Sequence, residues 1–241
     1  MVRVAPLPGA PREPPLNDAV AAAAARTFEA LSAARGRRIV HPQGAAFRGA
    51  LLVEAPLPGT LLADPGSRHG VVARFSRALG TPRGRGDFLG LALRIDERQD
   101  LLLAAATAAP IARYLPRPAR RFDGTTFTSL LPLRAGARVC LVGARVHHLA
   151  SAADDQLLGL VEAAARGPLA VVLAVARPGN RWRRIAVVEL DERLPPDTAL
   201  AFDPWLAGGG IVPWGRLNAL RAPAYRGSRR GRLAPPQRGR G

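Results

Sequence analysis

The chain has 241 residues and a formal net charge of +17, since 35 basic residues, all of them arginine, outnumber 18 acidic ones. This length suits one domain with a sizeable core, and 48% hydrophobic but only 5% aromatic residues indicate a core of alanine, leucine and valine. The single cysteine, Cys140, excludes an internal disulfide and a thiolate metal site, and no apolar run is long enough to cross a membrane as a helix.

The N-terminal region predicts an extended arm followed by a helix. Residues 1–16 are rich in proline and lack the apolar run of a secretion signal, so we expect a cytoplasmic protein. Asn17 can cap a helix that covers residues 18–34, and Gly36 would end it.

The hydrophobic pattern changes to that of strands after residue 41. The expected strands are 47–53, 71–76, 88–95, 100–106, 139–146, 169–176 and 182–190, with a second helix at 154–166. Short strands that follow one another along the chain predict an α+β protein built on a largely antiparallel β-barrel with a few flanking helices. We expect a single domain from 17 to 225 and a disordered tail, rich in arginine, glycine and proline, at 226–241.

A set of short motifs follows these elements in order. Arg38-x-x-His41-x-x-Gly44 is followed by Val72-Ala-Arg-Phe-Ser76 and Gly86-Asp-Phe-Leu-Gly-Leu-Ala-Leu-Arg94, and then by Asp100-Leu101, Ala201-Phe-Asp-Pro204, Arg216-Leu217 and Arg221-x-x-x-Tyr225. This order and spacing resemble the haem catalases, and most of all the small catalase-related haem proteins, which keep the barrel and drop the flanking domains. The resemblance touches both ends of the fold and is patchy between about residues 105 and 198.

The resemblance implies a haem b cofactor with four residues on its distal side. His41 would be the distal base, which moves a proton from one peroxide oxygen to the other. Arg38 would bind a haem propionate, Arg74 would lie near the propionates, and Ser76 would orient His41. The segment around His41, taken alone, is also compatible with a surface or core histidine that has no chemical role.

On the proximal side, the resemblance implies that Tyr225 is the axial ligand of the haem iron and that Arg221 stabilises its phenolate. Four residues apart on a helix, both side chains would share one face. Since a free tyrosine has a pKa of about 10, an axial phenolate needs ferric iron and a nearby cation. Pro223 departs from this pattern because it can kink the helix, and Tyr225 could instead anchor the C-terminal segment.

The distal side departs from the family at residues 103–110. Catalases carry a distal asparagine in an Asn-Asn-Thr-Pro stretch after the Asp-Leu pair, whereas this stretch contains no amide. Losing one well-placed donor typically costs about 10²–10³-fold in rate, and it should impair dismutation of hydrogen peroxide more than general peroxidase activity. Distal aromatic residues are also missing, and Tyr114 and Phe122 are the candidates to replace them.

The sequence therefore predicts a haem-dependent peroxidase that acts on organic hydroperoxides or hydrogen peroxide, with weak or no true catalase activity and an unidentified electron donor. Rearrangement of a lipid hydroperoxide is a related activity, and a homo-oligomer is compatible with the sequence. The alternative is a catalase-like shell that binds haem or another ligand, or nothing, without turnover. A third hypothesis is non-specific contact with nucleic acid, a membrane surface or other anions through the arginine-rich tail.

Overall fold

The computed structural model describes residues 44–82, 84–147, 156–215 and 218. Its strands are β1 (Gly44–Val53), β2 (Arg68–Arg77), β3 (Leu89–Ile95), β4 (Gln99–Ala106), β5 (Thr126–Thr128), β6 (Leu133–Ala135), β7 (Arg138–His147), β8 (Leu169–Ala176), β9 (Arg183–Arg193) and β10 (Ile211–Pro213). Its helices are the short 3₁₀ helix η1 (Ala112–Tyr114) and α2 (Gln156–Ala164). The expected arm, the helix at 18–34 and the tail lie outside the described residues.

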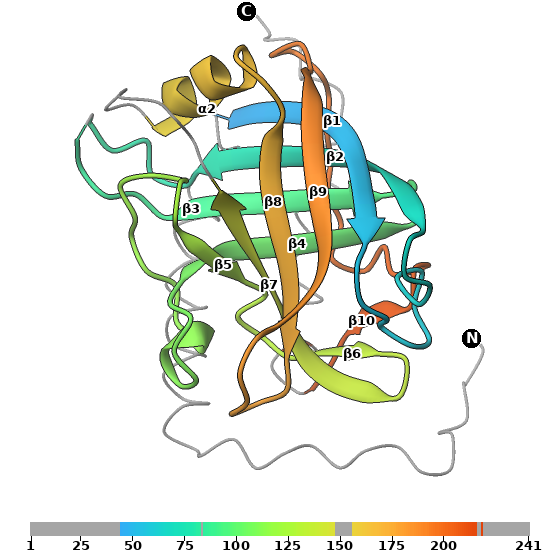
Figure 1. The fold of residues 1–241 in the computed structure, drawn as a ribbon. Coiled ribbons are helices and arrows are strands. Elements are labelled where there is room, and N and C mark those ends of the chain that lie inside the picture. Colours follow the sequence, from blue (N-terminus) through green and yellow to red (C-terminus); the bar gives the residue numbers. More distant parts are fainter. Residues whose placement is uncertain (1–43, 83, 148–155, 216–217, 219–241) are drawn as a thin grey trace, which may run out of the picture.

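The strands close into a barrel, and every ladder between two of them is antiparallel. Hydrogen bonds run in the order β7-β5-β4-β3-β2-β1-β9-β8, and β8 returns to β7, so eight strands form a ring. β6 and β10 extend the sheet from β7. The ribbon shows β8 and β9 crossing the run of β1 to β4, with α2 at one end (Figure 1). The predicted antiparallel barrel with few helices is therefore confirmed.

Alternating residues of the strands fill the inside of the barrel. β3 alternates strictly between buried and half-buried positions, as expected for a strand with only one face in the core. Phe47, Phe75, Phe122 and Phe127 form a chain of rings in this core, with centroids 5.8, 5.3 and 6.0 Å apart. Phe122 thus belongs to the aromatic part of the barrel core.

Cys140 of β7 is buried, as its apolar surroundings in the sequence indicate. Burial raises the pKa of its thiol to about 11. The thiolate is the reactive form of cysteine, so this side chain packs as a small apolar group.

Among the described helices, none is long and apolar enough to cross a membrane.

Asp87 organises the predicted loop between β2 and β3. Its carboxylate is buried and accepts hydrogen bonds from the backbone N–H groups of Leu79 (2.9 Å) and Thr81 (3.0 Å). Arg77 lies 3.5 Å from it. Burial by itself raises the pKa of Asp87, but these hydrogen bonds and the charge of Arg77 outweigh it, so that the pKa lies below its ordinary value.

A lowered carboxyl pKa gives Asp87 a stabilising effect that depends on pH. An unfolded aspartate titrates near pH 3.9, so the stabilisation is complete above about pH 4 and is lost as the pH falls through the lower folded pKa. We expect Asp87→Asn to cost about 2 kcal/mol of unfolding free energy at pH 7 and much less at pH 3. Urea unfolding of both proteins across this range tests the prediction, and a difference that is independent of pH would contradict it.

Candidate functional site

Arg74 and Ser76 share one face of β2. Side chains alternate along a strand, and Phe75 between them is fully buried in the barrel core, so Arg74 and Ser76 point to the outside of the barrel. Their backbones are separated by roughly 7 Å, the rise of two residues in a strand. The structure therefore brings both predicted side chains to one face of β2, where Ser76 is buried and Arg74 is half-buried.

Glycines flank Ser76 on both sides. Its cross-strand neighbours are Gly44 of β1 and Gly90 of β3. A Cβ atom at Gly90 would lie 2.7 Å from Ser76 Oγ, and one at Gly44 would lie 2.7 Å from Arg74 Nη2. The Arg74 side chain thus reaches back along the sheet towards the position of Ser76. Both glycines leave space for these polar groups that a side chain would occupy.

The small residues continue across the sheet. In the row of Ser76, Gly90 pairs with Ala104 of β4, and Ala104 pairs with Thr128 of β5. In the neighbouring row, Arg74 pairs with Ala46 of β1 and Ala92 of β3. We call this outer surface the glycine-alanine shelf; its members are Gly44, Ala46, Arg74, Ser76, Gly90, Ala92 and Ala104. Arg74 and Ser76 are the polar members of this shelf, and partial burial lowers the pKa of Arg74.

A hollow follows the C-terminal end of β4. Its volume is about 300 Å³, and it is lined by residues 105–108, 117–119 and 124–126, none of which carries a side-chain amide. The hydroxyl of Thr107 is buried without a hydrogen-bond partner in the described structure.

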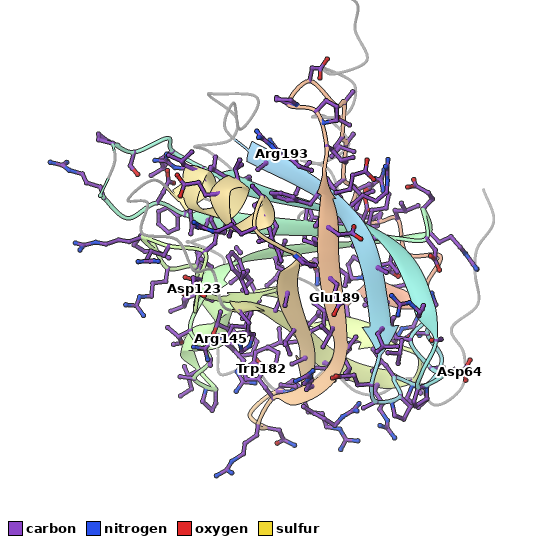
Figure 2. The ribbon with its side chains drawn as sticks, turned by 45° about the horizontal axis from the view of Figure 1, so that its top comes forward. Asp64, Asp123, Arg145, Trp182, Glu189 and Arg193 are labelled. Atoms are coloured by element: carbon purple, nitrogen blue, oxygen red, sulfur yellow. The ribbon has the colours of Figure 1, made fainter. Side chains whose placement is uncertain are left out.

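Arg113 is a buried cation that the sequence analysis did not identify. It is only 1% exposed, burial lowers its pKa, and no acidic side chain of the described chain pairs with it. Its Nε donates to the Ala109 carbonyl at 3.3 Å, while Nη1 has no hydrogen-bond partner among the described residues. Its guanidinium lies 4.7 Å from the ring of Trp182, which is labelled in Figure 2. This cation–π contact compensates part of the desolvation.

The carbonyl of Arg113 accepts a hydrogen bond from Thr128 Oγ1 at 2.7 Å. Thr128 is the cross-strand neighbour of Ala104, so this bond holds η1 close to the shelf. Tyr114, the predicted replacement for a distal aromatic residue, is buried next to Arg113, and burial raises its pKa. An arginine inside the short apolar stretch 111–115 was the only signal in the sequence for this feature. Its partner Trp182 lies far along the chain and could not be inferred.

Two motifs that carry the family resemblance have a structural role. Asp100 is buried and accepts two hydrogen bonds from Arg94, at 2.8 and 2.7 Å, and one from the backbone N–H of Asp203 at 2.7 Å. The Arg94 guanidinium also lies 5.2 Å from the Phe202 ring. The side chain of Gln99 is fully buried, and it accepts a hydrogen bond from the N–H of Ile211 and donates one to its carbonyl. These residues fasten the segment 201–211 to the barrel.

Four of the six predicted site residues, Arg38, His41, Arg221 and Tyr225, lie outside the described residues. The chain enters β1 at Gly44, directly beside Ser76, and Gly44 follows His41 by three positions in the sequence. Near the C-terminus, Asn218 donates to the carbonyls of Pro132 (2.8 Å) and Trp214 (2.7 Å). The described chain thus begins at Gly44, shortly after His41, and reaches Asn218, shortly before Arg221.

Gly90→Ala tests whether the space beside Ser76 matters. Its Cβ would force the Ser76 hydroxyl to move, since the two atoms would be 2.7 Å apart. If Ser76 orients a catalytic base, we expect peroxidase activity to fall about fivefold to tenfold, the value of one hydrogen bond. Ser76→Ala should cost the same, and the double variant should be no worse than either. Additive losses would show that the two positions act independently.

Comparison with known proteins supports the architecture. No protein-family model matches the chain, and no curated protein matches it in sequence. Among solved structures, it is similar to catalase A from Saccharomyces cerevisiae, with 14% identity and a TM-score of 0.55 over 97% of this chain and 68% of that one. It is also similar to a fungal catalase, with 14% identity and a TM-score of 0.56 over 97% and 67% of the two chains. At this identity, the likeness shows a catalase-like fold.

Proposed function

We propose that this protein is a haem-dependent peroxidase that acts on organic hydroperoxides or hydrogen peroxide and has weak or no true catalase activity. One observation supports this most: Arg74 and Ser76 face outward together on a shelf of glycine and alanine, next to a hollow without an amide. The catalase-like fold and the order of the motifs add to it. When bound, haem would supply the redox chemistry that breaks the O–O bond of a peroxide.

The residues of this chain fit such a group. The glycines beside Ser76 make room on the shelf for the polar ends of Arg74 and Ser76, and the partly buried cation of Arg74 suits a propionate. Arg38 would bind the propionates with it. Tyr225 would ligate the iron as a phenolate, and Arg221 would stabilise that anion.

The distal chemistry would rest on His41 and Ser76. Ser76 would hold one ring nitrogen of His41, leaving the other to take a proton from one peroxide oxygen and return it to the departing one. The stretch 103–110 offers no amide to orient hydrogen peroxide. The hollow of about 300 Å³ beside it offers space for the organic part of a larger hydroperoxide.

The alternative is a catalase-like shell that binds haem or another ligand without turnover. The absent amide favours it, because the shelf then lacks a donor for peroxide. The proposed peroxidase differs from it by consuming peroxide at the expense of an added reductant.

An absorption spectrum and a peroxide turnover assay together distinguish these functions. The full chain, expressed with a haem precursor, is compared with Tyr225→Phe. We expect a Soret band of ferric, tyrosinate-ligated haem that changes in the variant, together with faster turnover of cumene hydroperoxide than of hydrogen peroxide. No haem in either protein after reconstitution would reject the proposed function. Bound haem without peroxide turnover would establish the shell instead.

A further inference from the structure

A second group of reactive side chains lies at the other end of β2. Ser67 directly precedes β2, His69 is its second residue, and Asp96 is in the turn between β3 and β4. His69 and Ser76 are seven positions apart on one strand, which corresponds to roughly 24 Å. Figure 2 shows Asp64, the neighbour of this group in the β1–β2 connection, at the right-hand edge of the molecule. The group is therefore separate from the shelf.

The three side chains form a continuous hydrogen-bonded series. His69 Nδ1 lies 2.6 Å from Asp96 Oδ2, and His69 Nε2 lies 3.1 Å from Ser67 Oγ. The second oxygen of Asp96 accepts the backbone N–H of Gly70 at 2.8 Å. A serine, a histidine and a carboxylate in this order are the components of a nucleophile, its base and the group that orients the base, whatever their order in the sequence.

The hydrogen-bond partners determine where the protons lie. Nδ1 faces a carboxylate, so in the neutral imidazole it carries the hydrogen and leaves Nε2 as an acceptor. Ser67 Oγ also lies 2.7 Å from the carbonyl oxygen of Asp64. Its hydroxyl hydrogen thus has two acceptors, and a rotation about the C–O bond directs it to His69 Nε2. Ser67 is half-buried, the side chain of His69 is 14% exposed and that of Asp96 is 39% exposed, so the group lies at the surface.

The turn that carries Asp96 is strained. Asp96 and Glu97 have φ angles of 48° and 54°, in the left-handed region that glycine and asparagine occupy most readily. Non-glycine residues in this region cost of order 1–3 kcal/mol each and are concentrated at functional sites. Here the conformation presents both carboxylate oxygens of Asp96 to the same neighbouring strand, to His69 and to the Gly70 N–H.

We propose that Ser67 is a nucleophile activated by His69 and Asp96, and that this end of the barrel hydrolyses small activated esters. Ser67 Oγ forms a bond to the ester carbonyl carbon while its proton passes to His69 Nε2. The carbon–oxygen bond to the alcohol breaks, and the alcohol leaves with that proton. Water then attacks the acyl-serine carbonyl carbon and gives a proton to His69 Nε2. The bond between that carbon and Ser67 Oγ breaks, Nε2 returns the proton to Oγ, and the carboxylic acid leaves. This activity is independent of haem and of the proposed peroxidase function.

Labelling of the full chain by a fluorophosphonate probe tests the proposal, because the probe reacts with activated serines. We expect one label, located on Ser67 by mass spectrometry, and at least a hundredfold slower labelling in His69→Gln. Ser67→Ala should carry no label and should lose hydrolysis of p-nitrophenyl acetate. Glu97→Gln is the matched control in the same turn, and it should be labelled at the unmodified rate.

Thermal unfolding of each variant separates loss of chemistry from loss of structure. The proposal is supported if labelling falls in His69→Gln and Asp96→Asn while their unfolding transitions stay cooperative. It is overturned if Ser67 remains unlabelled, if the label lies on another serine, or if His69→Gln is labelled as fast as the unmodified chain. The last result would mean that Ser67 is merely accessible.

Discussion

Replacing Ala104 by asparagine is expected to raise the rate of hydrogen peroxide turnover by about 10²-fold in the haem-loaded protein, since one oriented donor typically contributes about 10²–10³. Ala104 lies in the row of Ser76, across Gly90, and its side chain faces the shelf. Two strand spacings, roughly 10 Å, separate its backbone from that of Ser76. An amide at 104 would therefore face the same ligand as Ser76 from the other side.

Ala105→Asn is the matched control for this gain. Ala105 is buried and its side chain points into the barrel core, so the amide would be buried in apolar surroundings and would cost about 1–3 kcal/mol of stability without increasing turnover. The comparison uses initial rates with hydrogen peroxide and with cumene hydroperoxide. Equal rates in Ala104→Asn and the unmodified protein would mean that the shelf does not bind peroxide. A rise in Ala105→Asn alone would mean that peroxide meets the core-facing side of β4 and does not meet the shelf.

Removing the carboxylate of Asp100 should lower the free energy of unfolding by about 3–5 kcal/mol, the usual cost of leaving one member of a buried ion pair without its partner. Asp100→Ala would leave Arg94 without its two hydrogen bonds and Asp203 without an acceptor for its N–H. Hydrogen bonding to Asp100 raises the pKa of Arg94. Arg94 nevertheless stays charged when the carboxylate is lost, because a guanidinium keeps its proton in proteins. Urea denaturation of the two proteins measures this difference.

The exposed pair Arg48 and Glu192 supplies the control, with similar contacts at 2.7 and 2.8 Å but side chains 55% and 54% exposed. Glu192→Ala should cost less than about 1 kcal/mol because water screens the pair. Hydrogen exchange should also accelerate in residues 201–211 in Asp100→Ala, since Asp100 and Arg94 fasten that segment. Equal costs for the two variants would mean that burial of Asp100 does not strengthen its contacts.

The sequence predicted the strands that combine alternating hydrophobicity with turn residues at their ends. The predicted strands 71–76 and 88–95 correspond to β2 and β3, although β2 extends further at both ends because its backbone pairing continues through polar residues. β4 formed where alanine favours a helix, because a place between β3 and β5 outweighs intrinsic propensity. β5, β6 and β10 have three residues each and are too short to produce a periodic signal.

The candidate site divides in a similar way. The sequence alone determined that Arg74 and Ser76 lie on one face of a strand, because a period of two needs no tertiary information. Gly44 and Gly90 become the neighbours of Ser76 only through the register of β1, β2 and β3. The order of the motifs indicated Asp100 and Arg94 as important, but their mutual contact and their hold on residues 201–204 appear only in the fold.

Local patterns thus determined the barrel, its antiparallel strands and the face that Arg74 and Ser76 share. Only the tertiary structure decided that this face lies outside the barrel, and that Arg113 lies on Trp182 without an acidic partner among the described residues. It likewise brought Asp96 to His69, 27 positions away in the sequence. The reason is physical: hydrophobic periodicity reports which face of an element is buried, whereas contacts between distant polar side chains depend on strand register and loop conformation, which the periodicity does not encode.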